Sequence, residues 1–214
     1  MKFTSPLKYR KNQKTTITQP FGANPKYYSK YKIPGHNGID FVNGHQRNCY
    51  GIGITATHAG RVTKVIAEEP MSTKGNGVYI QVLKDKKRYK SVYWHLSEVL
   101  VRVGDYVKQG QLVGRMGNSG IVRPAPNISK PYQGTHLHYG LYVWEIRDNN
   151  WFKVNEDYKG AVDPMPYFSD NTIARNFQEK LERPNLGRLS IILAPIIWAI
   201  GILKEELRKM KGRN

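Results

Sequence analysis

The stretch Gly134-Thr-His-Leu-His-Tyr-Gly-Leu-Tyr-Val-Trp-Glu-Ile-Arg147 decides the fold and holds the strongest candidate site. It is rich in β-branched and aromatic residues, which favour β-strands. Because side chains at i and i+2 leave a strand from the same face, His136 and His138 are expected to point into one space. Two neighbouring neutral imidazoles are explained if one binds a metal ion and the other transfers protons. The alternative for this motif alone is a pair of exposed histidines on a solvent-facing strand.

Other short runs of the same character surround this stretch, at Gly60–Glu68, Gly77–Leu83 and Arg88–His95. Gly, Asn and Lys turns separate these runs, and no helical period lies between them. The segment Val101–Gly114 places glycines between valines, as tight corners of β-sheets do. We therefore predict a mainly β fold, an antiparallel β-sheet or sandwich, with an α-helical C-terminal tail.

Composition divides the chain into three predicted parts: a basic N-terminal arm (1–14), a β-rich domain (15–168) and a helical tail (169–214). Within the tail, residues 189–203 form an apolar segment of 15 residues without a charge. As a helix this segment spans about 22 Å, less than the ~30 Å hydrocarbon core of a bilayer. Three interpretations remain open for it: a helix docked on the domain or in an oligomer interface, a membrane-associating segment, and a spanning helix.

The net charge and the cysteine content limit which functions and sites are possible. The 214 residues include 34 Lys and Arg against 16 Asp and Glu, which gives a net charge of +18. Such a surface attracts polyanions, yet no nucleic-acid motif is present, so nucleic acid is not the expected partner. The single cysteine, Cys49, excludes an intramolecular disulfide and a Cys-based structural zinc site, and we expect it to be a small buried hydrophobe. The N-terminus lacks the apolar run of a signal peptide.

Two further motifs supply partners for the histidine pair. His36-Asn-Gly-Ile-Asp40 offers an imidazole and a carboxylate, both good Zn²⁺ ligands, although this spacing alone also fits an ordinary turn with a solvated Asp. His95 lies in a predicted strand, where alternation places it on the same face as Ser91 and Tyr93.

Together the motifs match a catalytic zinc site, which has three protein ligands, one open position and nearby proton-transfer groups. The three candidate ligands are His36, Asp40 and His138, and the two spare imidazoles are His95 and His136.

The order of these motifs resembles that of the lysostaphin-like zinc metalloendopeptidases, also called LytM-type peptidases, which cut peptide bridges of bacterial peptidoglycan. The resemblance covers about residues 18–168 and is carried by His36-x-x-x-Asp40, Tyr93-x-His95-Leu96, Val103-Gly-Asp-x-Val-x-x-Gly110 and His136-Leu-His138. It implies an antiparallel sheet crossed by a groove, Zn²⁺ as the cofactor, and His36, Asp40 and His138 as its ligands. It also implies catalytic roles for His95 and His136 and leaves open which of them is the main base.

The function predicted from this resemblance is hydrolysis of peptide cross-links or bridges of peptidoglycan; the alternative is an inactive relative that binds the wall or forms part of a virion. Tyr27, Tyr28 and Tyr31 precede the first ligand, and Tyr31 is the candidate substrate-binding residue. The long segment Ile121–Gly134 is predicted to form one wall of the groove.

A bacteriophage protein, carried in the virion or released from the cytoplasm at lysis, would reach the cell wall without a signal peptide. Its expected partners are peptidoglycan and anionic wall polymers. Residues 186–214 are expected to contact phage tail or virion proteins or a membrane.

Overall fold

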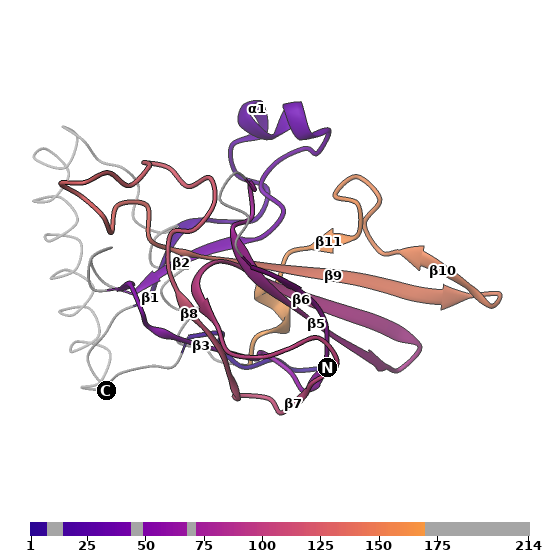
Figure 1. Ribbon diagram of the computed structural model, residues 1–214. Helices are drawn as coiled ribbons and strands as arrows, with labels where there is room; N and C mark the ends of the chain where they lie inside the picture. Colours follow the sequence, from indigo (N-terminus) through magenta and orange to yellow (C-terminus); the bar gives the residue numbers. More distant parts are fainter. Residues whose placement is uncertain (8–14, 44–48, 68–71, 170–214) are drawn as a thin grey trace, which may run out of the picture. The chain divides into compact units, whose positions relative to one another are not determined.

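The computed structural model describes residues 1–7, 15–43, 49–67 and 72–169 (Figure 1). Within these residues, 11 strands join in a sheet whose paired strands are all antiparallel. The strands are β1 (Thr15–Gln19), β2 (Ile39–Asn43), β3 (Gly53–Thr55), β4 (Gly60–Ile66), β5 (Asn76–Lys84), β6 (Lys87–Val99), β7 (Tyr106–Val107), β8 (Leu112–Met116), β9 (Leu137–Arg147), β10 (Asn150–Lys153) and β11 (Ala161–Val162). The helices described are α1 (Pro25–Tyr28) and the single-turn 3₁₀ helices η1 (Ser29–Tyr31) and η2 (Met165–Tyr167). The predicted mainly β, antiparallel fold is confirmed.

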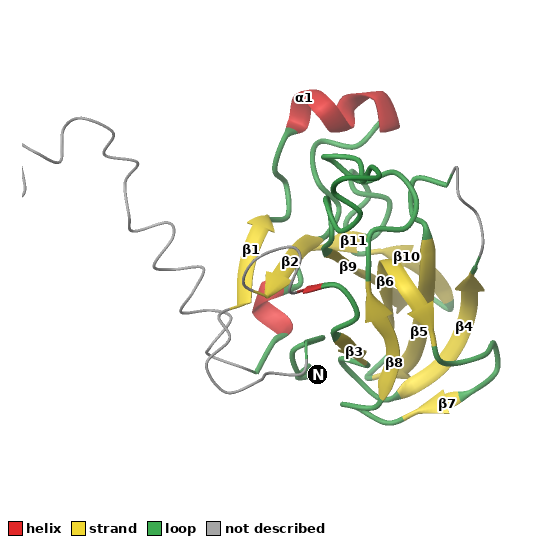
Figure 2. Cartoon of the chain, turned by 60° about the vertical axis from the view of Figure 1, so that its left-hand side comes forward, coloured by secondary structure: helices red, strands yellow, loops and turns green. Residues whose placement is uncertain are grey.

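The order of the strands brings distant parts of the sequence together. The main path of the sheet runs β1-β2-β9-β6-β5-β4-β7, while β8 joins β3 to β6, and both β10 and β11 pair with β9 (Figure 2). Strand β9 therefore lies between β2 and β6. These three strands carry all the predicted site motifs, or lie directly beside them.

The central strand β9 separates the core from the opposite face by alternation. Its odd-numbered residues, from Leu137 to Val143, are fully buried in the main hydrophobic core. Its even-numbered residues, beginning with His138, point to the other face, where a smaller apolar cluster forms around Tyr79 and Trp94. The sheet thus presents one face to the core and reserves the other for the site.

A buried polar network lies on the core side of β6 and β9. The Thr57 hydroxyl lies 3.0 Å from the Tyr93 hydroxyl and 2.9 Å from that of Tyr139. Ser91 joins Tyr93 to His58, whose Nε2 lies 3.0 Å from the Ser91 hydroxyl. Burial lowers the pKa of His58, which keeps this imidazole neutral. His58 therefore has a structural role in this network.

Two apolar residues within the predicted N-terminal arm pack into the core. Phe3 is fully buried, Leu7 is 2% exposed, and the two residues form bridges with Phe168 and Ile54. The average composition of residues 1–14 is polar and basic. An average of this kind does not reveal two single apolar residues that are buried in the core. The predicted domain boundaries remain predictions.

The predicted helical tail, from residue 170 on, and its apolar segment at 189–203 lie outside the described residues. Among the residues that the structure describes, we find no helix with the length and apolar character needed to cross a bilayer.

Candidate metal centre and groove

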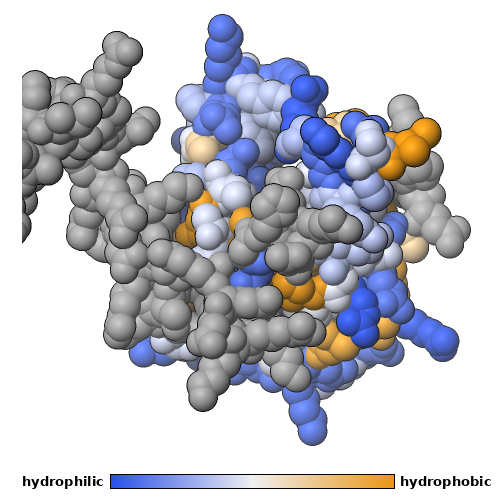
Figure 3. Space-filling view, turned by 90° about the vertical axis from the view of Figure 1, so that its left-hand side faces the viewer, coloured by the Kyte–Doolittle hydropathy of each residue, from blue (hydrophilic) through white to orange (hydrophobic). Residues whose placement is uncertain are grey.

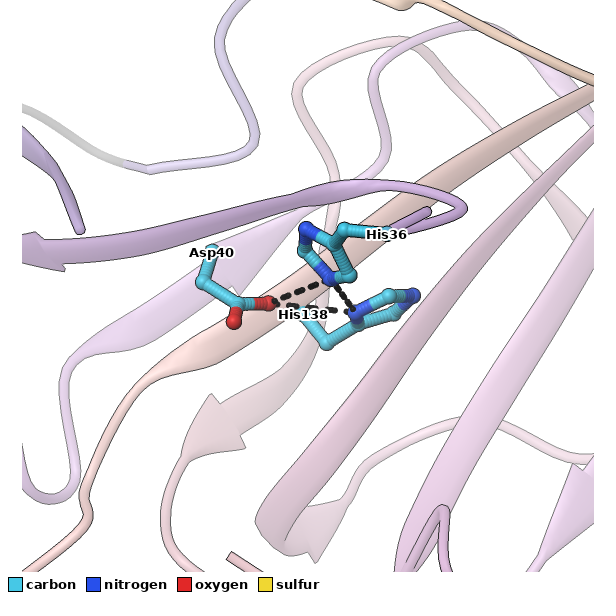
Figure 4. Close-up of side chains that lie close together, drawn as sticks. All are labelled: His36, Asp40 and His138. Atoms are coloured by element: carbon cyan, nitrogen blue, oxygen red, sulfur yellow. Dashed lines mark hydrogen bonds and ion pairs between the residues drawn. The ribbon is translucent and has the colours of Figure 1, made fainter. Parts of the chain in front are cut away.

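Three side chains, two from neighbouring strands and one from the loop before β2, meet at one point, and they are the predicted metal ligands (Figure 4). Asp40 on β2 and His138 on β9 are direct partners in the strand register, and His36 lies in the loop before β2. His36 Nε2 lies 2.9 Å from His138 Nδ1 and 3.2 Å from Asp40 Oδ1. His138 Nδ1 lies 3.1 Å from the same carboxylate oxygen. All three residues are buried.

The donor atoms of this group fit a zinc ion. Zn²⁺ binds imidazole nitrogen and carboxylate oxygen at about 2.0–2.2 Å in a tetrahedron, which separates the ligand atoms by about 3.3 Å. The triangle of His36 Nε2, His138 Nδ1 and Asp40 Oδ1 comes close to that spacing. A shared cation explains why two imidazole nitrogens face each other beside a carboxylate. The zinc site predicted at these three residues is confirmed.

The loop that carries His36 is adapted to this site. The ring Nδ1 of His36 donates a hydrogen bond to the carbonyl oxygen of Pro20 at 3.2 Å, which leaves Nε2 free to bind the metal. A Cβ on Gly38 would lie 2.8 Å from the His138 ring and 2.5 Å from the Tyr139 carbonyl oxygen. The glycine inside the His-x-x-x-Asp motif thus permits a close approach between the loop and β9.

The charges at the site keep its ligands deprotonated. Burial alone would raise the pKa of Asp40, but charge interaction with His136 and the polar contacts with His138 and His36 outweigh it and hold the pKa well below its usual range. Burial lowers the pKa of His138 to about 4. A carboxylate and a neutral imidazole are the protonation states that metal binding requires.

The two remaining site histidines stand next to the metal ligands with fixed tautomers. His95 Nδ1 donates to the carbonyl oxygen of Ser119 at 2.9 Å, and His136 Nδ1 donates to that of Gly134 at 2.7 Å. Each ring therefore leaves its Nε2 free, and His136 Nε2 lies 3.8 Å from Asp40 Oδ2. The two ring centroids are 4.6 Å apart. Burial, together with the charges of His136 and His138, lowers the pKa of His95 to about 3, so this ring is neutral at pH 7.

The predicted strand face of His95 is wrong, although its proximity to the site is right. Tyr93 points into the core, and simple alternation would place His95 there too. Instead, Trp94 and His95 together face Gly77 of β5 in a β-bulge, and His95 has a left-handed φ of 63°. The extra residue turns the imidazole to the face that carries His138.

We expect Gly77→Ala to disturb this bulge and lower activity. A Cβ at position 77 would lie 2.8 Å from Trp94 Cδ1 and 2.9 Å from the Tyr93 carbonyl oxygen, so the bulged residues must shift. The expected cost is about 1–3 kcal/mol of unfolding free energy, with a fall in kcat, measured by urea denaturation and by peptidase assay.

Gly110→Ala is the matched control for this prediction. A Cβ at position 110 would meet nothing within 4 Å, but the residue has a φ of 80°. It should lower stability through backbone strain without lowering kcat. Equal activity losses in the two variants would show that the bulge has no special role.

The site lies in a groove with a volume of about 1200 Å³. Tyr31, 38% exposed, lines this groove, as the sequence suggests for a residue that meets substrate; its contact with substrate stays a prediction. The ring of Tyr28 lies 5.4 Å from that of His36, centroid to centroid. Of the segment 121–134, the part that lines the groove is Ile121–Arg123.

Sequence reasoning missed the residue that supports the ligand His138. The indole ring of Trp94 lies parallel to the His138 imidazole, with an interplanar angle of 10° and a centroid distance of 4.5 Å. Trp94 and His138 are cross-strand partners. The register between β6 and β9 was the signal that would have revealed this pair.

Curated proteins similar to this chain are peptidases. An uncharacterized metalloprotease of Haemophilus influenzae is 29% identical over 64% of this chain and 24% of its own length. Lysostaphin of Staphylococcus simulans is 28% identical over 71% of this chain and 25% of its own, and its solved structure aligns with a TM-score of 0.47 at 25% identity, covering 71% of this chain and 48% of that one. Peptidoglycan DD-endopeptidase ShyA of Vibrio cholerae is 31% identical over 69% of this chain and 29% of its own. The chain spans about a quarter of the length of these curated relatives.

A family model gives the assignment. The model of peptidase family M23 matches residues 34–155, more than half of the chain and the region that contains every metal ligand. This chain therefore belongs to peptidase family M23, in agreement with the lysostaphin-like resemblance of its motifs.

Proposed function

We propose that this chain is a zinc-dependent endopeptidase that hydrolyses peptide cross-links or bridges of bacterial peptidoglycan. One observation carries the proposal: a complete His-Asp-His ligand set lies in the groove beside two histidines whose Nε2 atoms are free. The relatives support the choice of substrate, since ShyA of Vibrio cholerae is a peptidoglycan DD-endopeptidase.

The metal ligands and the two other site histidines would have different roles in hydrolysis. His36, Asp40 and His138 would hold a zinc ion, which would supply a water of lowered pKa and a Lewis acid for the scissile carbonyl. Of His95 and His136, one accepts the proton of the attacking water and returns it to the leaving amine, while the other donates a hydrogen bond to the developing oxyanion. The Ser119 and Gly134 carbonyls hold both rings in the tautomer that this needs.

The complete ligand set argues against an inactive, purely wall-binding relative. Such a protein has no use for a buried carboxylate and two buried imidazoles, because these groups cost free energy unless they are paired or bind a metal. In this chain His36, Asp40 and His138 converge on one point.

The excess of positive charge supports a role for anionic wall polymers in targeting. The net charge is +18, and hydrophilic side chains cover much of the upper part of the face shown in Figure 3. We propose that this surface binds such polymers, so that wall binding weakens as salt rises. A bacteriophage origin, with the tail segment 186–214 contacting virion proteins or a membrane, is part of the same proposal.

Purified walls of two chemotypes test the activity. Zinc-loaded protein is expected to lower the turbidity of walls with polyglycine bridges or of walls with direct cross-links, and mass spectrometry of the products will identify the bond cut. A chelator should stop the reaction and added zinc restore it. If the zinc-loaded protein releases no new amino groups from either wall, the proposed function is wrong.

A further inference from the structure

The face of the sheet that carries the metal ligand His138 continues as a row of rings and cations along β9 and β6. By alternation, Tyr142 and Trp144 share this face with His138. Their cross-strand partners on β6 are Lys90 and Arg88. At ~3.4 Å per residue, Trp144 lies about 20 Å along the strand from His138. In Figure 1, β5, β6 and β9 extend side by side beyond the site toward β10. We call Arg88, Lys90, Tyr142, Trp144 and Trp151 the cationic strip.

Aromatic rings hold the cations of this strip in place. Lys90 Nζ lies 4.8 Å from the centroid of Tyr142 and 4.6 Å from that of Trp144. The two rings are stacked with an interplanar angle of 18°. Arg88 Cζ lies 4.2 Å from the ring centroid of Trp151 on β10. Such contacts order long side chains and so reduce the entropy lost when an anion binds.

No acidic side chain pairs with these cations within the described ranges 1–7, 15–43, 49–67 and 72–169. The nearest acid along β9, Glu145, points to the other face by alternation and pairs with Lys87 and Arg147. Burial and the positive charges of Lys74 and Arg88 lower the pKa of Lys90, as expected where cations lack counter-charges.

The strip is continuous with the groove. Lys90 and Tyr142 line the same groove as His138. The Tyr142 hydroxyl accepts a hydrogen bond of 2.9 Å from Asn37 Nδ2, in the loop between the ligands His36 and Asp40. A polymer that crosses the metal centre along β9 therefore passes directly over the strip.

We propose that the cationic strip binds carboxylates of the substrate's stem peptide on one side of the bond to be cut. The inference rests on the proposed function and specifies which part of the substrate this face recognises. Fixed cations without acidic partners select an anionic chain, and the continuity with the groove selects the chain that the site hydrolyses. Peptidoglycan stem peptides supply such carboxylates.

The test uses zinc-loaded protein and synthetic stem peptides that differ only in whether their carboxylates are free or amidated. Binding of uncross-linked peptides, measured by calorimetry, needs no turnover. The parent is expected to bind the free form about tenfold more tightly than the amidated form, as for charge-assisted hydrogen bonds. The double variant Arg88→Met/Lys90→Met should bind both forms equally, because Met keeps an unbranched apolar chain but removes the charge. With a cross-linked dimer as substrate, KM should rise while kcat stays within about twofold.

Lys108→Met is the matched control, because Lys108 is exposed and lies outside the groove. It should retain the preference for free carboxylates. The proposal is overturned if the parent binds free and amidated peptides equally, or if the double variant keeps the preference. Tighter binding of a single-stranded oligonucleotide that disappears in the double variant would also overturn it, since rings beside cations also suit nucleic acid.

These outcomes separate the two proposals. If the parent protein cleaves walls but does not prefer free over amidated carboxylates, only the proposed role of the cationic strip is refuted. A parent that binds free carboxylates through Arg88 and Lys90, but cleaves no wall, refutes the endopeptidase and leaves a peptide-binding face.

Discussion

His138→Ala is expected to remove zinc from the protein and to lower peptidase activity by more than about 100-fold. Loss of outer-shell partners alone costs about 10–100-fold in metal affinity or activity, and His138 is a direct ligand. Its Nδ1 lies within 3.1 Å of both other ligand atoms, and the side chain is buried against Trp94, so no solvent-exposed group can replace it. Metal content per chain and the rate of peptide release measure the two effects.

The chelated parent protein is the control for this prediction, since it lacks the metal but keeps every side chain. Added zinc should restore activity to the parent and not to His138→Ala. Asp40→Asn provides a second variant of nearly unchanged volume, which loses the buried negative charge but leaves no cavity. Full zinc content in both folded variants would contradict the assigned ligands.

His95→Ala and His136→Ala are expected to keep zinc and to lower kcat, each by about 10²–10⁴-fold. This is the usual contribution of a positioned general acid or base. Neither ring supplies an atom of the ligand triangle, and in both rings Nδ1 is bonded to a backbone carbonyl, so Nε2 is the nitrogen available to the reaction. The double variant should lose less than the product of the single losses, because groups that act on one transition state are not additive.

The pH dependence of the two single variants distinguishes the base from the oxyanion donor. In the variant that lacks the base, activity should rise with hydroxide concentration, because solvent must then take the proton. Loss of zinc from either variant would instead make that histidine a ligand, and unchanged kcat in either would remove it from the reaction.

Local patterns predicted most of the site because the chemistry follows short-range rules. His136 and His138 share a face through strand alternation, and Asp40 reaches them because β2 pairs with β9. The bulge at His95 was not predictable from alternation, since one extra residue against Gly77 reverses the face. A glycine within an apolar strand was the available signal, and it marks such bulges.

Features that depend on strand register were invisible in the sequence. Trp94 behind His138 and the cations of the strip become neighbours only when β6 is aligned with β9. The buried Phe3 was hidden for another reason, because a composition average over a basic segment gives little weight to one apolar anchor.

Three histidines of the site bond a backbone carbonyl through Nδ1, and this affects how the site tolerates sequence change. Their partners are the carbonyl oxygens of Pro20, Ser119 and Gly134, and every amino acid provides a carbonyl oxygen. The tautomers therefore depend on the path of the backbone and not on a side-chain acceptor. At position 134 that path requires glycine, because φ is 74° and a Cβ would lie 2.4 Å from the Pro124 carbonyl oxygen. An insertion or deletion in the same loops would move the carbonyl oxygens, and the site histidines would lose the hydrogen bonds that fix their tautomers. Among proteins related to this chain, the lengths of these loops should vary less than the amino acids in them.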